Sequence, residues 1–282
     1  MGQSNGDNTN ARAAAGTRSA GTAKVIRLLL VRTQRSWGFR IGGALGALAI
    51  LGGLVLLTVV RGAHVTPGSG LGALPALPNL FAHGICWGVA TLAVFGTEQR
   101  AFMRDHEDGI RGLLGSRGQD ALYGRARLAS AITSAAIISV GCTALLGIAT
   151  ALAATGTGEA IRTWQSAGSG ILYSALFSII MGTLALAVLG GRGRGGGYLG
   201  LVTVLVLPEL LEPLTTRALP TELGHAIPIS IPSILSAIAR PTSAANFLAG
   251  ICAAAIVVGL ASAYGKRERL RVDAEFAREG TS

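Results

Sequence analysis

The densest group of ionisable side chains lies between residues 98 and 130, in the stretch EQRAFMRDHEDGIRGLLGSRGQDALYGRARLAS. Six arginines and five acids make this stretch highly charged but nearly neutral. Helical spacing links Phe102, Asp105 or His106, Gly109 and Leu113, and the pair Leu113-Leu114 predicts an exposed apolar tip. A charged helix with such a tip is suited to docking on a partner protein. The alternative is a solvated loop that only joins two hydrophobic segments.

Residue types that perform catalysis are present but not arranged for it. The histidines His64, His83, His106 and His225 are scattered, and no Ser-His-Asp set or carboxylate pair is recognisable. The glycine-rich stretch GGRGRGGGY (190–198) lacks the Lys and Ser/Thr of a phosphate-binding loop. We therefore expect no enzymatic activity, no resident metal and no covalently bound cofactor.

His83 is the histidine of most interest, because it lies in an apolar run beside Asn79 and Trp87. Polar side chains inside a membrane are costly and often functional. We interpret His83 and Trp87 as candidates for a transport pathway or a subunit interface. The alternative is that His83 is a polar residue facing the interior of a helix bundle.

Composition indicates that lipid is the main solvent of this chain. Half of its 282 residues are hydrophobic and only 13% are charged, against roughly 25% charged residues in soluble domains. The 41 glycines lie mostly in apolar runs, and Gly42-xxx-Gly46 and Gly84-xxx-Gly88 would allow helices to approach closely. The net charge of +10 comes from arginines that flank apolar runs, which argues against nucleic-acid binding.

Hydropathy predicts an all-α polytopic membrane protein with six spanning helices. The tail 1–23 is polar and predicted to be disordered, residues 24–265 form the membrane domain, and 266–282 form a second tail. Within 24–37, Lys24, Arg27 and Arg35 share one helical face, which predicts a helix lying in the membrane interface. The alternative is a basic extension of the first span. The predicted spans are 41–60, 76–97, 128–154, 169–190, an irregular segment from 197, and 243–265.

Charge asymmetry predicts the orientation of these spans. Of the 24 basic residues, about twenty fall on the side that holds both termini and the loop 98–127. Only Arg61, Arg162, Arg217 and Arg240 fall on the other side. Both termini are therefore expected in the cytoplasm, with the chain in a bacterial cytoplasmic (inner) membrane.

The fifth span is interrupted by Pro208, Glu209, Glu212 and Pro213. A helix starting near Gly197 would reach Pro208 after about 17 Å, close to mid-membrane. We expect the helix to break there and 209–240 to form short helices, with Glu209 and Glu212 facing a subunit interface or an exit path. If the helix starts instead at Arg192, both acids become ordinary boundary residues.

The order of these segments resembles the type-2 ABC exporter permeases. In that family an acidic Asp-Gly stretch followed by a leucine pair forms a coupling helix against an ATPase subunit. The residues that carry the resemblance are Phe102, Asp105, Glu107, Asp108, Gly109, Leu113 and Leu114. The resemblance implies that the partner ATPase hydrolyses ATP and that a second permease subunit completes a homodimer or heterodimer.

Within this group, residues 84–114 and 194–214 are most similar to the haem-exporter permease of cytochrome c maturation, its B subunit. The resemblance implies haem as cargo. This chain has Ser116-Arg117-Gly118 where those permeases have a proline-containing turn, and Glu209 and Glu212 where they have apolar residues. The alternatives are export of a lipid, drug or glycan by the same architecture, or a non-transporting membrane scaffold.

Overall fold

The computed structural model describes residues 23–62, 74–115, 120–154, 157–191, 194–218 and 227–279. Every regular element in these ranges is helical, which confirms the all-α prediction. The long helices are α2 (Trp37–Gly62), α7 (Asp120–Ala153), α8 (Thr157–Leu189), α9 (Arg194–Ala218) and α12 (Ala244–Glu279). One further long passage joins η1 (Leu74–Ala76), α3 (Leu77–Gly84), the π-helical turn η2 (Ile85–Ala90) and α4 (Thr91–Glu98). Short helices are α5 (Ala101–Glu107), α6 (Ile110–Gly115) and α11 (Ile231–Ala239).

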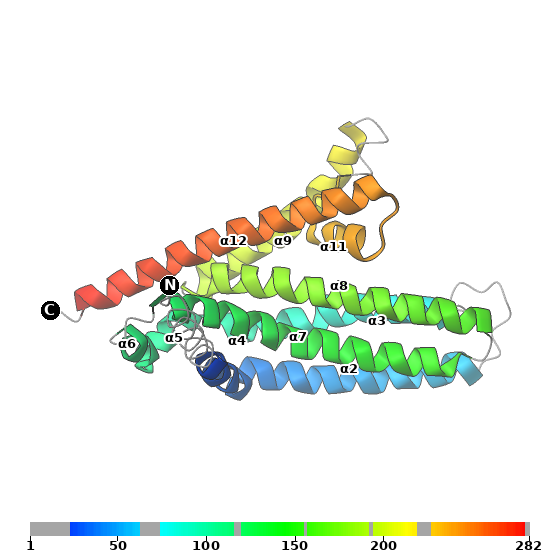
Figure 1. Cartoon of the computed structure of the whole chain (residues 1–282), viewed down its shortest axis with the longest axis horizontal. Coiled ribbons are helices and arrows are strands. Elements are labelled where there is room, and N and C mark those ends of the chain that lie inside the picture. The colour runs from blue at the N-terminus through cyan, green and yellow to red at the C-terminus, as the bar shows by residue number, and fades with distance from the viewer. Residues whose placement is uncertain are drawn as a thin grey trace, which may run out of the picture.

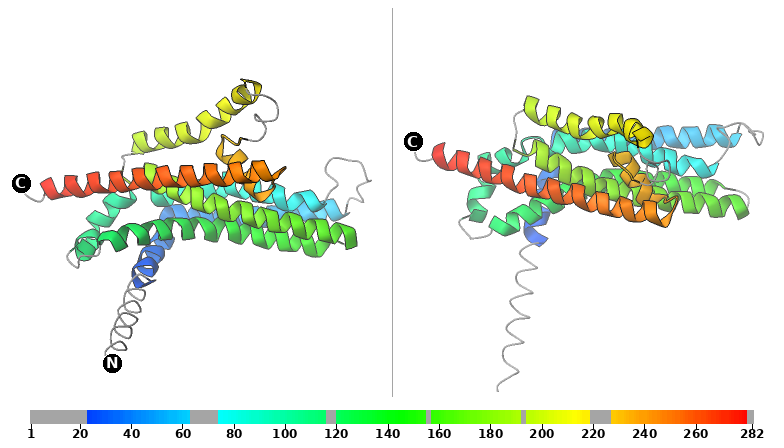
Figure 2. Two further views of the ribbon diagram at one scale, coloured as in Figure 1. Left: turned by 45° about the horizontal axis from the view of Figure 1, so that its top comes forward. Right: turned by 90° about the horizontal axis from the view of Figure 1, so that it is seen from above.

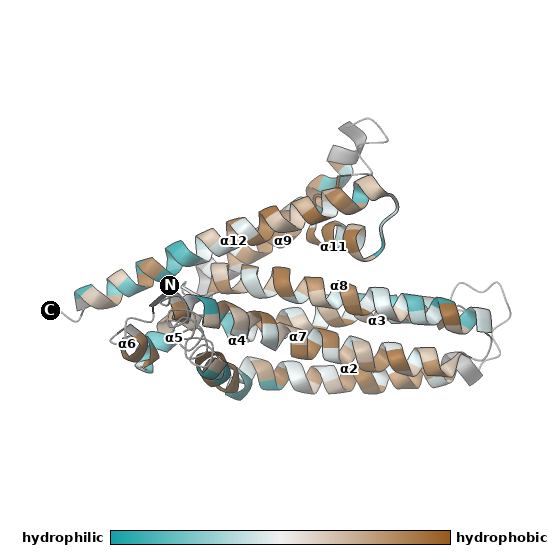
Figure 3. Ribbon diagram, viewed as in Figure 1, coloured by the Kyte–Doolittle hydropathy of each residue, from teal (hydrophilic) through white to brown (hydrophobic). Residues whose placement is uncertain are grey.

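Among the described residues, five helical segments are long and apolar enough to cross a membrane. They are Trp37–Val59, Leu74–Glu107, Leu122–Ala153, Thr157–Leu189 and Ala244–Arg278. Hydrophobic residues run along their middle portions, whereas hydrophilic residues gather on α5 and the C-terminal half of α12 (Figure 3). These segments agree with five predicted spans, but a sixth is not confirmed. Residues 266–279, predicted as a tail, continue α12, and residues 1–22 of the predicted disordered tail lie outside the described ranges.

The segment predicted as an irregular fifth span is α9, which is not among these five, and the predicted break at Pro208 is wrong. The helix continues from Arg194 through Pro208 and Pro213 to Ala218. Each proline removes one backbone donor, yet the helix around them is kept. The chain returns through the short helix α11, which confirms only that part of the expected short-helix region. Residues 219–226 lie outside the described part of the chain.

The helices form an elongated bundle with α8 at its centre (Figures 1 and 2). Helix α8 packs against α7, α12, α3, α9 and α11. Figure 1 shows α9 and α12 inclined away from the other long helices, with α11 between α12 and α8. The two ends of the described chain, residues 23 and 279, lie toward the same end of the bundle as α5 and α6. Helix α9 carries the chain away from that end, and α12 returns it.

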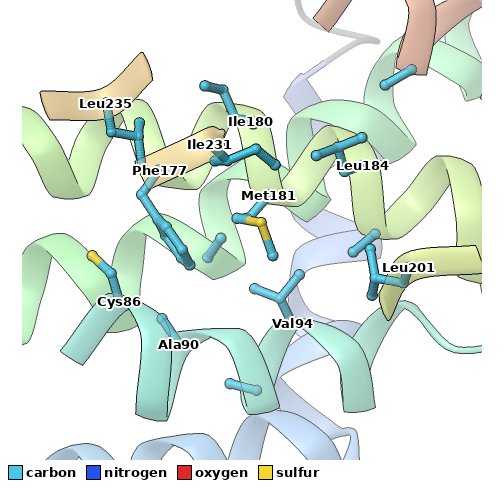
Figure 4. Packing of buried hydrophobic residues seen from close by; sticks show 14 of the residues in the cluster. Cys86, Ala90, Val94, Phe177, Ile180, Met181, Leu184, Leu201, Ile231 and Leu235 are labelled. Atoms are coloured by element: carbon cyan, nitrogen blue, oxygen red, sulfur yellow. The ribbon is translucent and has the colours of Figure 1, made fainter. Parts of the chain in front are cut away.

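The main hydrophobic core lies where η2, α4, α8, α9 and α11 meet (Figure 4). Phe177 and Met181 of α8 are fully buried there. Leu201 of α9 and Leu235 of α11 are also fully buried, and both helices pack against α8. Burial of this kind contributes about 1.5–3 kcal/mol for each large side chain in water, and in lipid it acts mainly through close packing.

Close approach of α2 to its neighbours depends on one of the two predicted glycine pairs. A Cβ added at Gly42 would lie 2.2 Å from the Ala93 Cβ, and one at Gly46 would lie 3.0 Å from the Cys142 Sγ. The prediction for this pair is therefore confirmed. Gly84 and Gly88 have open space where a Cβ would stand, so that pair mediates no close contact among the described residues.

A separate helix over residues 23–35 precedes α2, with a bend at Ser36. It turns sharply away from α2 (Figure 2). Its predicted polar face is partly correct, because Lys24, Arg27 and Arg35 are exposed while Leu29 is fully buried. Arg32, at the boundary of that face, points into the protein and forms ion pairs.

Candidate functional site

The charged stretch after α4 folds into two short helices, α5 and α6, rather than one. The chain turns at Asp108 and at Gly109, whose φ of +71° lies in the left-handed region that favours glycine. Two backbone hydrogen bonds fix α5 to the end of α8: Arg100 N–H donates to Leu189 O and Phe102 N–H donates to Gly190 O, each at 2.9 Å. Phe102 is buried beneath them.

Asp105 is the centre of a buried ionic network. Its side chain is only 2% exposed and accepts a hydrogen bond from Arg32 Nη1 at 2.7 Å. Tyr123 Oη donates to the other carboxylate oxygen, also at 2.7 Å, and Arg127 Nε lies 3.6 Å from it. Arg32 also pairs with Asp108 and donates to the Arg104 carbonyl. Asp105 thus joins α5 to α7 and to the helix over 23–35.

A second ionic contact ties α6 to the far end of the chain. Asp273 of α12 accepts hydrogen bonds from Arg111 Nε at 2.9 Å and Arg111 Nη2 at 2.8 Å. His106 Nε2 lies 2.7 Å from Asp273 Oδ1, and its ring stacks on Phe276 with centroids 4.5 Å apart. This contact fixes both α5 and α6 to α12.

The remaining predicted residues of this stretch divide between inside and outside. Glu107, Asp108 and Leu113 face outward, with side-chain exposures of 49%, 56% and 51%. Leu114 is only 4% exposed and packs in a cluster that contains Phe102 and Val272. The predicted apolar tip is therefore Leu113 alone, because consecutive helical residues point about 100° apart. We call Glu107, Asp108 and Leu113 the outer face of α5 and α6.

A buried ion pair behind α5 was missed by the sequence analysis. Arg127 Nη2 of α7 donates to Glu98 Oε2 of α4 at 3.0 Å, and the two side chains are 4% and 0% exposed. Arg127 Nη1 also donates to the Thr33 hydroxyl at 3.4 Å. The signal available in the sequence was a pair of opposite charges, each at the boundary of an apolar run.

The predicted pathway residues His83 and Trp87 meet at Tyr173 of α8. Trp87 Nε1 donates to the Tyr173 hydroxyl at 2.8 Å, and the His83 Nδ1 lies 3.3 Å from that hydroxyl. Trp87 belongs to the π-helical turn η2, a distortion frequent at functional sites. The Arg240 guanidinium lies 5.8 Å from the centroid of the Tyr173 ring. We call these four side chains the Tyr173 cluster. Tyr173 is fully buried and Trp87 partly buried, whereas His83 and Arg240 are exposed, so His83 does not face the bundle interior.

The two predicted acids of α9, Glu209 and Glu212, differ in burial. Glu209 is exposed and its charge acts on Tyr173. Glu212, one helical turn further, is partly buried, and so is Pro208. Glu209 therefore influences the Tyr173 cluster through its charge, and no contact among the described residues joins it to His83 or Trp87. Cysteines 86 and 142 are buried and free, as expected of packing residues, whereas Cys252 is exposed.

Comparisons with known proteins identified no relative of this chain. No protein-family model matches the chain, and searches of curated proteins and of solved structures also found no match.

Proposed function

We propose that this chain is the membrane permease subunit of an ABC exporter, driven by a separate ATPase subunit that docks on the outer face of α5 and α6. The observation that carries the proposal is the way these two short helices are attached. Hydrogen bonds and ion pairs connect them to α8, to α7, to α12 and to the helix over 23–35. A displacement of the outer face is therefore passed to several long helices at once.

The outer face itself has the composition of a docking site. Leu113 is an exposed apolar side chain, and the exposed acids Glu107 and Asp108 form ion pairs with Arg100 and Arg32. An apolar anchor with charged neighbours gives affinity from the anchor and orientation from the charges. The charge asymmetry of the sequence supports a cytoplasmic position for this face in a bacterial inner membrane, where ATP is available to the partner.

Haem is the cargo that we propose first, on the resemblance of residues 84–114 and 194–214. The Tyr173 cluster supports this cargo, because it combines aromatic rings with the imidazole of His83 and the cation of Arg240. A flat aromatic molecule with carboxylates is complementary to such a set. A second permease subunit, identical or related, would complete the pathway on the side of α9. Lipid, drug or glycan export by the same architecture is the alternative.

The docking proposal is tested by replacing one exposed leucine. We expect Leu113→Asp to abolish co-purification of the ATPase subunit, because burying an unpaired carboxylate costs several kcal/mol. Leu270→Asp is the matched control, since Leu270 is 53% exposed on α12 outside the outer face. Both variants should insert normally in the membrane. Equal ATPase recovery with the two variants would make α5 and α6 a mere connection between helices.

The cargo is tested separately in inverted membrane vesicles that contain both subunits. ATP-dependent uptake of haem is the expected result, and Tyr173→Phe should reduce it by removing two hydrogen bonds. Uptake of a fluorescent lipid without uptake of haem would replace haem with the alternative cargo. Absence of any ATP-dependent uptake would favour a scaffold.

A further inference from the structure

A polar pocket lies where the helix over 23–35 meets α2, the end of α4, α5 and α7. Its volume is about 170 Å³, about ten times the least that holds one water molecule. Four arginines line it, namely Arg32, Arg35, Arg104 and Arg127. Asp105 is the carboxylate in the lining. The pocket is therefore cationic and large enough for a small anionic group.

The carboxylates around the pocket do not balance its arginines. Asp105 is already engaged by Arg32 and Tyr123, and Glu98 by Arg127. Arg104 donates to the Thr97 carbonyl, and the like charges of Arg127 and Arg32 act on it together with the opposite charges of Glu98 and Asp105. Close like charges repel and favour a bound counter-ion.

Two arginines are left without an acid. Neither Arg35 nor Arg104 forms an ion pair within the part of the chain that the structure describes. The exposed position of Arg35 at the mouth of the pocket leaves its guanidinium available for a ligand.

A buried donor in the pocket also lacks a partner. Arg127 is 4% exposed, and its Nε has no hydrogen-bond partner among the described residues. The contact of this Nε with Asp105, at 3.6 Å, is longer than a hydrogen bond. A buried unsatisfied donor costs about 1–3 kcal/mol. An acceptor oxygen in the pocket would remove this cost.

We propose that the pocket binds the phosphate group of an anionic lipid. Arginine guanidinium groups recognise phosphate through paired hydrogen bonds, and the hydroxyl of Ser36 adds a further donor in the lining. Trp37, which follows Ser36 of the pocket lining in the chain, is 77% exposed at the start of α2, one of the helices that could span a membrane. Exposed tryptophan at the end of a spanning helix is typical of the headgroup level. This position favours a lipid over a soluble phosphate compound.

The test uses the purified full chain without any ATPase. The chain is released for native mass spectrometry from nanodiscs with equal amounts of phosphatidylglycerol and phosphatidylcholine. We expect wild-type protein to retain phosphatidylglycerol selectively, and Arg35→Gln and Arg104→Gln to lower this retention about tenfold. Arg27→Gln is the matched control, because Arg27 is an exposed arginine of the same helix that does not line the pocket. Arg35→Gln changes an exposed residue, so it tests binding even where Arg104→Gln disturbs folding.

A second arm distinguishes the two sources of phosphate. Inorganic phosphate is titrated by calorimetry into the chain in an uncharged detergent. Phosphate binding that Arg35→Gln weakens, without selective lipid retention, would overturn the lipid as ligand and assign the pocket to a soluble phosphate compound. Equal retention by wild type, Arg27→Gln and Arg35→Gln, together with no phosphate binding, would overturn the phosphate site itself.

Discussion

Asp273 near the end of α12 receives two hydrogen bonds from Arg111 of α6, at 2.9 and 2.8 Å. The two residues are 162 positions apart in the sequence. The bond therefore joins the α5–α6 unit to the last long helix of the bundle. Paired hydrogen bonds between arginine and a carboxylate are among the strongest that side chains form.

Removing the Asp273 carboxylate should weaken the contact between α6 and α12 and lower the stability of the protein. Asp273→Asn loses one ionic acceptor of Arg111 and His106, and we expect it to cost about 1.5–3 kcal/mol. Glu275→Gln is the control, because Glu275 is 51% exposed and lies 3.8 Å from Arg271 in its ion pair. Thermal unfolding of the purified variants measures the difference. Equal melting temperatures for the two variants would show that the Asp273 contact contributes nothing to stability.

Removing one member of the buried ion pair between Glu98 and Arg127 should lower the stability of the protein strongly, whereas replacing both with apolar residues should lower it little. We expect Glu98→Leu and Arg127→Met each to destabilise the protein by about 3–5 kcal/mol, since one charge stays buried without its partner. The double replacement Glu98→Leu with Arg127→Met should recover most of that loss. Denaturant unfolding of the four proteins is the measurement. Purely additive losses would contradict the assigned pairing.

The close packing of α2 is tested by an alanine substitution at Gly42, with the same substitution at the neighbouring Gly43 as the control. Gly42→Ala places a methyl group 2.2 Å from the Ala93 Cβ, whereas the same change at Gly43 meets open space. Overpacking of this kind costs about 1–3 kcal/mol. We expect Gly42→Ala to lower the melting temperature and Gly43→Ala to leave it unchanged. The same melting temperature for both would place α2 further from α4 than the structure has it.

Orientation in the membrane is tested with single cysteines in a chain whose native cysteines are replaced by serine. Gly112 and Glu275 are exposed at the α5–α6 end, and Gly158 and Thr242 are exposed near the other end. The charge asymmetry predicts that only the first pair is labelled from the cytoplasm by an impermeant thiol reagent. Labelling of a cysteine at position 112 from outside intact cells would reverse the orientation.

Hydropathy was sufficient to predict five of the apolar spans, because length and lack of charge decide whether a helix suits lipid. The sequence-based prediction failed at α9, where Pro208 had indicated a break in the helix. A proline removes only one hydrogen bond, and the helix can continue when neighbouring turns are intact. Leu201, buried against α8, supplies tertiary packing that no local pattern contains.

The candidate site was predictable in its composition but not in its connections. Residues 101–115 were identified from their charge and spacing, but the burial of Asp105 depends on Arg32, 73 positions earlier, and on Tyr123. Such distant partners leave no local signal. The opposite orientations of Leu113 and Leu114, in contrast, follow from helical geometry and could have been foreseen.

The most direct test of the central claim is a crosslink from residue 113 to the ATPase subunit. A photoreactive phenylalanine analogue is placed at Leu113, and at Leu270 as the control with similar exposure. Both proteins are illuminated in membranes that also contain the ATPase. We predict a crosslinked ATPase from position 113 and none from position 270. No crosslink from 113, or equal crosslinks from both positions, would contradict docking on the outer face of α5 and α6.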